Sequence, residues 1–325
     1  MGRQKEHIKL DQMVKYLFQD SNKVVVNLLN GIFNENFKED EIDISIGNNE
    51  FIKHSLDIIR ADMVYKVQKK DNLNKLIKFH IEFQMKNDIT MAIRAFEYGF
   101  NIANEDSDKK DGITTLYFPK QKIIFFEKNT GVDDILKLKL VFPNGSEYNY
   151  SVEVIKYWEY STEMIIAKKL YPLIPFQLFT LRKDLEKSSS RKKDKVNTKD
   201  IKVIELAKSL SDISVDLVND NEIDIDYFNK MIVVISNMIN YFNNEYFMDK
   251  NIEEEFRMYV KSLYDPIVEK RGEERGEKRG EKIGEKKALI KVAINLLDIL
   301  DDETIALKTG LKIEEVKKLR KENLN

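Results

Sequence analysis

Apolar and polar positions alternate along two neighbouring stretches of this chain, residues 58–67 and residues 75–85. A period of two is typical of a β-strand with one buried face. The connection between them, residues 70–74, is rich in turn-forming residues. The pattern therefore predicts a β-hairpin with an apolar face and a polar face. In its second strand these faces are Phe79, Ile81, Phe83 and Met85, against Lys78, His80, Glu82 and Gln84.

A helix is predicted directly after the hairpin, at residues 89–103. Apolar residues recur there at helical spacing, so this side is expected to pack on the sheet. Arg94 and Tyr98 are four residues apart and share a neighbouring face of the same helix. The predicted apolar stripe consists of Ile89, Ile93, Phe96, Phe100 and Ala103.

Helices and strands are predicted on both sides of this centre. Residues 7–18 have the apolar spacing of a helix, and residues 42–46 alternate like a strand. A turn at residues 143–146 indicates a second hairpin. The expected later strands are residues 114–118, 122–126, 136–142 and 148–155, followed by a helix at 158–170 and an apolar return at 173–185.

The predicted fold class is α/β: a mixed sheet flanked by helices, with a strand-rich extension and a helical C-terminal region. The predicted parts are a domain at 1–187, a basic linker at 188–198, a helical module at 199–267, a Gly/Glu/Arg/Lys repeat at 268–286 and a small helical tail at 287–325. In the tail, Ala306, Gly310 and Val316 have helix-turn-helix spacing. Glu314 and Glu315 begin the last helix, where phosphates would repel them, so a protein-contact bundle is favoured over a DNA reader.

Composition excludes several classes of protein. The 325 residues are 42% hydrophobic and contain no cysteine, which excludes disulfides, thiolate zinc sites and cysteine nucleophiles. The sequence has neither a signal-peptide pattern nor an apolar run long enough to span a membrane. We therefore expect a cytoplasmic protein without a membrane partner. The net charge of −2 means that any DNA binding must come from a local patch.

The register of the first hairpin brings two carboxylates together. If the hairpin folds about Asn72, Asp62 lies directly opposite Glu82, with Cβ atoms roughly 4.5–5.5 Å apart. Two carboxylates at that distance repel each other unless a cation lies between them. Mg²⁺ commonly binds one or two carboxylates and leaves its other positions to water and phosphate. Gln84 follows on the face of Glu82.

Asp62 together with Glu82-Phe83-Gln84 resembles the active site of PD-(D/E)XK nucleases, with glutamine replacing the usual lysine. More narrowly, the chain resembles the bacterial recombination-promoting nuclease / putative transposase family. The family's opening motif, its I-E-x-Q motif, the arginine and tyrosine of its next helix and its tail all have counterparts. These are Asp11, Lys15 and Phe18; Ile81, Glu82 and Gln84; Arg94 and Tyr98; and Thr309, Gly310 and Leu311.

The resemblance implies a restriction-endonuclease-like core and a Mg²⁺-dependent DNA endonuclease that promotes recombination, with Mn²⁺ as the alternative metal. Asp62, Glu82 and the backbone carbonyl of Phe83 would hold the metal, whose activated water hydrolyses the phosphodiester bond. Gln84 would orient that water or the scissile phosphate. DNA is the implied partner, and a homo-oligomer formed through the C-terminal region is a further expectation.

Several assignments stay open at this point. Asp11 and Lys15 are either accessory groups for metal or phosphate, or a surface ion pair. Arg94 with Tyr98 either contacts phosphate, or Arg94 pairs with an acidic residue of its own helix. His80 shares the face of Glu82 and is read as a non-catalytic neighbour, with a metal ligand or base as the alternative.

Two other interpretations of the whole chain remain. One is a non-catalytic DNA- or protein-binding factor on a decayed nuclease fold, which the neutral Gln84 and the near-neutral net charge favour. The other treats Asp62 and Glu82 as the solvated face of an ordinary sheet.

Overall fold

The computed structural model describes residues 10–19, 22–52, 58–60, 62–129, 131–189 and 199–323. The chain divides into two compact units, Met1–Val260 and Lys261–Asn325. None of the described helices is long and apolar enough to cross a membrane.

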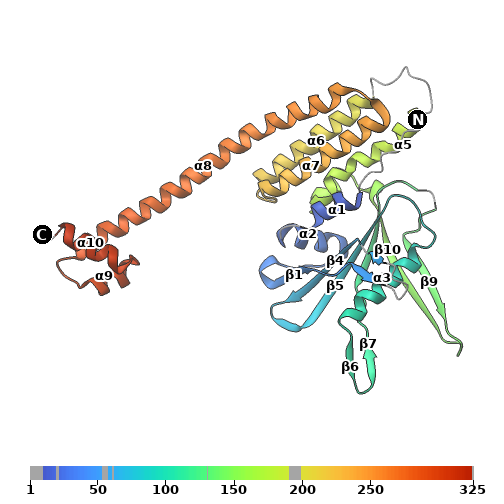
Figure 1. The fold of residues 1–325 in the computed structure, drawn as a ribbon, viewed down its shortest axis with the longest axis horizontal. Coiled ribbons are helices and arrows are strands. Elements are labelled where there is room, and N and C mark those ends of the chain that lie inside the picture. The colour runs from blue at the N-terminus through green and yellow to red at the C-terminus, as the bar shows by residue number, and fades with distance from the viewer. Residues whose placement is uncertain are drawn as a thin grey trace. The chain divides into compact units, whose positions relative to one another are not determined.

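A six-stranded mixed sheet forms the centre of the first unit (Figure 1). Its spatial order is β1 (Ile42–Ile46), β4 (Met63–Lys69), β5 (Asn72–Gln84), β8 (Lys120–Phe125), β10 (Glu147–Lys156) and β9 (Ile135–Val141). The first three strands are antiparallel, β5, β8 and β10 are parallel, and β9 is antiparallel to β10. The mixed α/β class is therefore confirmed.

Two small antiparallel strand pairs lie outside this sheet: β2 (Glu50–Ile52) with β3 (Ile58–Arg60), and β6 (Asp108–Lys110) with β7 (Ile113–Thr115).

The helices surround the sheet and form the C-terminal region. In the first unit they are α1 (Leu10–Phe18), α2 (Asn22–Phe33), α3 (Met91–Glu105), α4 (Thr162–Ala167), α5 (Arg182–Ser189), α6 (Lys199–Asn219) and α7 (Ile225–Phe242), with the short helices η1 (Glu39–Glu41), η2 (Tyr157–Glu159), η3 (Tyr171–Leu181) and η5 (Asn243–Phe247). Helix α8 (Lys250–Leu296) includes the predicted repeat, and α9 (Asp302–Thr309) and α10 (Ile313–Asn323) end the chain.

The register of the central hairpin is as predicted, but its first strand is not continuous. Met63 pairs with Ile81 and Val64 with His80. This is the register that places Asp62 opposite Glu82. The prediction of one continuous strand at 58–67 is wrong, because the structure has two strands there. The first, β3, pairs with β2 in a separate sheet, and the second is β4. Asp62 therefore lies just before β4, where the chain enters the main sheet. The turn is shorter than predicted, since β5 already begins at Asn72.

Aromatic packing fills one face of this sheet. The ring centroids of Phe18 and Phe83 are 4.9 Å apart, and those of Phe33 and Phe79 are 4.8 Å apart. The Tyr65 hydroxyl donates to the carbonyl of Phe18 at 2.7 Å. Helices α1 and α2 therefore cover the apolar side that the alternation of β5 predicted.

Helix α3 packs on the opposite face of the sheet (Figure 1). The side of α3 that faces the sheet differs from the predicted one. Ile89, Ile93 and Phe100 are 95%, 55% and 44% exposed. The buried positions are Met91, Ala95, Tyr98, Gly99, Ile102 and Ala103. The predicted stripe is therefore wrong for Ile89, Ile93 and Phe100, whereas Ala103 is buried and Phe96 packs against the core. The physical reason is the strand below, whose side chains on this face are polar and require hydrogen-bonding partners from the helix.

That polar face of β5 is buried, contrary to the half-buried strand that the alternation predicted. His80 and Glu82 are each 1% exposed. The buried Lys78 ammonium donates to the carbonyl of Ile102 at 2.7 Å and pairs with Asp106 at 2.8 Å. A cation at this place donates a hydrogen bond to a carbonyl group in the last turn of α3 and interacts favourably with the negative end of the helix dipole. The interpretation of Asp62 and Glu82 as a solvated sheet face is therefore wrong for Glu82.

The later elements match the prediction in part. Strands β8, β9 and β10 correspond to three of the four expected strands, and Gly145 adopts φ +82° in the turn between the last two. The strand expected at 114–118 is replaced by β7, outside the main sheet. The helix expected at 158–170 is interrupted: η2 precedes Ser161, which caps α4. The apolar segment predicted at 173–185 forms most of the buried helix η3.

Helices α6 and α7 pack on the sheet-bearing part of the first unit. The Tyr227 hydroxyl donates to the carbonyl of Leu17 at 3.0 Å, and Lys169 pairs with Glu222 at 2.7 Å. Residues 190–198 of the predicted basic linker lie outside the described residues. The domain boundaries stay a prediction.

The second unit contains the predicted small helical tail. Asp301 caps α9 by accepting from the Thr304 backbone at 2.8 Å, and Gly310 ends that helix with φ +71°. Ile305, Leu311 and Val316 are buried in its core.

Candidate functional site

Asp62 and Glu82 meet where β4 begins and β5 ends. The Phe83 backbone N–H donates to Asp62 Oδ2 at 2.8 Å. The Asp62 backbone N–H lies 3.4 Å from Glu82 Oε2. The hairpin register places these residues opposite each other, one step beyond the pair Met63 and Ile81 that ends the contact of β4 with β5. The structure therefore brings the two predicted carboxylates together.

The electrostatics of this pair are unfavourable in the absence of a cation. Burial raises the pKa of Asp62 well above its usual value, and the charge of Glu82 raises it further. The hydrogen bond from Phe83 acts in the opposite direction. Asp11 of α1 also raises the pKa of Asp62, so the predicted accessory carboxylate faces the same site.

Four donors surround the buried carboxylate of Glu82. Oε1 accepts from Gln84 Nε2 at 3.1 Å and from Arg94 Nη2 at 3.1 Å. Oε2 lies 3.3 Å from His80 Nε2, besides its contact with the Asp62 backbone. Gln84 therefore points at the site from the position predicted for it.

Arg94 and Tyr98 join the site from α3. The guanidinium reaches Tyr98 Oη at 3.1 Å and pairs with Asp88 at 3.1 Å as well as with Glu82. Burial raises the pKa of the Tyr98 phenol, and the charge of Glu82 adds to the effect. Arg94 therefore brings a positive charge to Glu82.

The site leaves Lys15 out and includes residues that the sequence did not indicate. Among the described residues, Lys15 makes no hydrogen bond or ion pair with the carboxylate pair. Asp88 holds Arg94 and also accepts from the Thr90 backbone at 2.8 Å. Its D-x-T turn before the helix was a local signal for this residue. Gln121, which contacts His80, lies far away in the sequence, and no local pattern indicated it.

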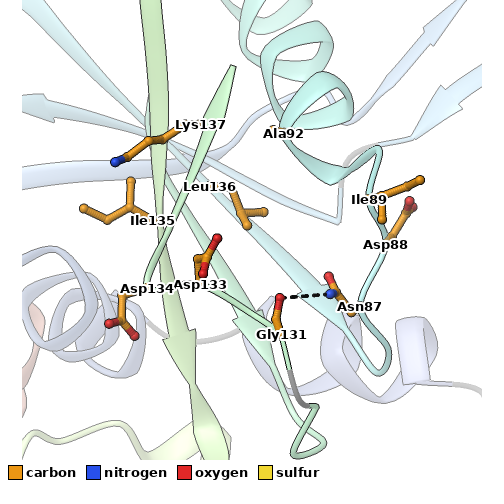
Figure 2. Close-up of a pocket in the computed structure, with 10 residues that line it drawn as sticks. All are labelled: Asn87, Asp88, Ile89, Ala92, Gly131, Asp133, Asp134, Ile135, Leu136 and Lys137. Atoms are coloured by element: carbon orange, nitrogen blue, oxygen red, sulfur yellow. Dashed lines mark hydrogen bonds between the residues drawn. The ribbon is translucent and has the colours of Figure 1, made fainter. Parts of the chain in front are cut away.

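A pocket of about 660 Å³ opens beside Asp88, between the start of α3 and β9 (Figure 2). Asn87 donates to the carbonyl of Gly131 at 3.3 Å across its floor. Its charged lining consists of Asp88, Asp133, Asp134 and Lys137. Because three of these four side chains are acidic, this pocket is a poor receptor for phosphate on its own.

The residues fit a weakly held hard cation. Among the described residues no cluster of three or more His, Cys, Asp or Glu side chains suits a metal. Mg²⁺ does not need such a cluster, because it commonly uses one or two carboxylates. Burial and, after it, the charge of Glu82 raise the pKa of Asp62, and a divalent cation would favour the charged form of this carboxyl group.

One comparison with known proteins matches this part of the chain. Residues 8–130 match the family model "Putative transposase, YhgA-like". The match covers less than half of the chain. No curated protein and no solved structure matches. The family segment runs from α1 through β8, so it contains both carboxylates, Gln84, Arg94 and Tyr98.

Proposed function

We propose that this chain is a Mg²⁺-dependent DNA endonuclease that promotes recombination. The observation that carries the proposal is the buried Asp62–Glu82 pair, which lies inside the YhgA-like segment. A mixed sheet flanked by helices is also the core that a PD-(D/E)XK nuclease requires. The family description names transposases, whose substrate is DNA, and this supports DNA as the partner.

Each residue has a separate role in this proposal. Asp62, Glu82 and the Phe83 carbonyl would hold Mg²⁺, or Mn²⁺ in its place. The bound ion would lower the pKa of a water molecule and stabilise charge on the phosphate. The Gln84 amide, fixed by its bond to Glu82, orients the water or the phosphate. Arg94 supplies positive charge, and its planar guanidinium suits phosphate oxygens.

A plasmid-nicking assay tests the proposal. Supercoiled plasmid is incubated with the purified chain and Mg²⁺ or chelator. Asp62→Asn and Glu82→Gln keep the size of each side chain but remove its charge. Asp43→Asn and Glu147→Gln are the matched controls, because both residues are exposed and lie in the sheet away from the site.

We expect metal-dependent nicking by the wild type and both controls, and at least a hundredfold loss in both site variants, since removed charge-stabilising groups typically cost about 10²–10³ in rate. Equal nicking by Asp62→Asn and wild type would contradict the metal site. Loss in the controls as well would show that the effect is not specific to the pair.

A second candidate function is a DNA- or protein-binding factor without catalysis. The Arg94–Glu82 ion pair favours it, because this guanidinium already neutralises the carboxylate that would otherwise hold metal. Calorimetric titration with Mn²⁺ separates the two functions. The nuclease requires a binding site that Glu82→Gln abolishes, whereas the binding factor shifts DNA on a gel equally well with or without Glu82.

A further inference from the structure

A chain of hydrogen bonds leads from β10 to Glu82. The Tyr150 hydroxyl donates to Gln121 Oε1 at 2.7 Å. Gln121 Nε2 lies 2.8 Å from the carbonyl oxygen of Ala95 and 2.9 Å from His80 Nδ1. His80 Nε2 lies 3.3 Å from Glu82 Oε2. Residues from β10, β8, α3 and β5 are thereby joined in one network.

The orientation of the Gln121 amide follows from its neighbours. A backbone carbonyl only accepts, so the atom facing Ala95 must be the amide nitrogen. That nitrogen has two hydrogens, and its second one points at His80 Nδ1. Nδ1 therefore accepts and carries no proton. The ring proton lies on Nε2, from which it is donated to Glu82.

The surroundings leave space for this arrangement. Gly99 of α3 lies against Gln121, and a Cβ atom there would come within 2.8 Å of Gln121 Oε1 and 3.0 Å of the Phe118 ring. The His80 ring packs edge-on against Tyr98 with centroids 5.5 Å apart, so it cannot turn away from Glu82 without losing this contact.

We propose that His80, Gln121 and Tyr150 are positioning residues for Glu82. They fix the His80 proton on Nε2, and the hydrogen bond from this proton holds the Glu82 carboxylate in one orientation. This inference deepens the proposed function and rests on it, since an oriented carboxylate matters most as a metal ligand. Outer hydrogen-bond partners of metal ligands typically change metal affinity by about 10–100-fold.

The proton position is measurable without metal or activity. The chain contains three histidines, so long-range ¹⁵N–¹H spectra of the full chain labelled at histidine contain three ring patterns. The pattern missing from His80→Gln identifies His80. We expect the proton on Nε2 in the wild type. In Gln121→Glu we expect Nδ1 to carry a proton, because a carboxylate at that place can only accept.

Metal affinity tests the positioning role. Calorimetry with Mn²⁺ compares His80→Met, which has similar size but no donor, with His80→Gln, whose amide N–H can replace Nε2–H. We expect His80→Met to lose about tenfold or more in affinity, and His80→Gln to stay within about threefold of the wild type. Tyr150→Phe, the mildest change, gives an intermediate loss.

Two outcomes would overturn the proposal. One is a wild-type His80 with its proton on Nδ1. The other is equal Mn²⁺ affinity for His80→Met and the wild type. A wild-type chain that binds no Mn²⁺ would instead contradict the proposed function, and the proton position would still decide the hydrogen-bond chain.

Discussion

Two carboxylates that share a buried site raise the free energy of the folded state when both are charged. Asp62 responds to this cost by a raised pKa, whereas Glu82 is matched with Arg94, Gln84 and His80. The two members of the pair are therefore stabilised by different means. At the scale of single residues, the raised pKa of Asp62 makes the stability of the fold depend on pH.

Asp62→Asn should remove a pH dependence of stability in chelator. The raised pKa means that the folded state binds the Asp62 proton more tightly than the unfolded state does. The free energy of unfolding therefore falls as the pH rises from the ordinary value of 3.8 through the folded pKa, and the loss is complete above it. Asparagine does not ionise and can accept the same bond from Phe83.

Urea unfolding across this pH range checks the prediction. We expect the advantage of Asp62→Asn over the wild type to grow with pH and then level off. Asp43→Asn, which removes an exposed carboxylate, should show little change. An advantage that stays the same at every pH would contradict the buried repulsion, and added Mg²⁺ should stabilise the wild type more than the variant.

At the scale of elements, helix α3 has its buried side where the sequence pattern did not place it. Ile102 is fully buried, whereas Ile93 is 55% exposed. Ile102→Ala should therefore cost about 2–4 kcal/mol of unfolding free energy, and Ile93→Ala less than about 0.5 kcal/mol. Denaturant unfolding measures both. Equal costs would indicate that the helix packs by the predicted stripe.

The hairpin and the helix differ in how far sequence alone determines them. The predicted register is correct from Gln68 to Met63, as the pairing of Met63 with Ile81 shows, although the turn is shorter than predicted and a register shift separates Gln68 from Lys69. The helix face depends on the strand beneath it. An apolar stripe is a poor guide when Lys78, His80 and Glu82 require buried polar partners.

The same distinction applies to the site. Asp62, Glu82 and Gln84 come from one local pattern, so the sequence indicated them. Gln121 reaches His80 only through the parallel pairing of β5 with β8, which follows a crossover through α3. The sequence around His80 therefore contains no pattern that predicts Gln121 as its neighbour.

At the scale of the whole molecule, the first compact unit is larger than the predicted N-terminal domain. Unit Met1–Val260 includes α6 and α7, which join its core through Tyr227 and Leu17. A chain ending at Val260 should therefore unfold in one cooperative transition and keep its carboxylate-dependent nicking. A chain ending at Lys187, the predicted boundary, should expose the apolar surface of η3 and aggregate.

Circular dichroism, denaturant unfolding and size-exclusion chromatography of the two shortened chains provide the comparison. A stable, monodisperse chain ending at Lys187 would support the predicted domain boundary instead. The second unit is absent from both chains, so the comparison reports the contribution of residues 188–260, which include α6, α7, η5 and the start of α8.

The position of Arg94 on α3 also affects how the chain folds. The helix that removes Glu82 from water carries the guanidinium that pairs with it, and Lys78 ties the other end of the same helix to the same strand. Desolvation and neutralisation of the carboxylate are therefore a single event. The docking of α3 on the sheet therefore buries this charge and supplies its cationic partner together.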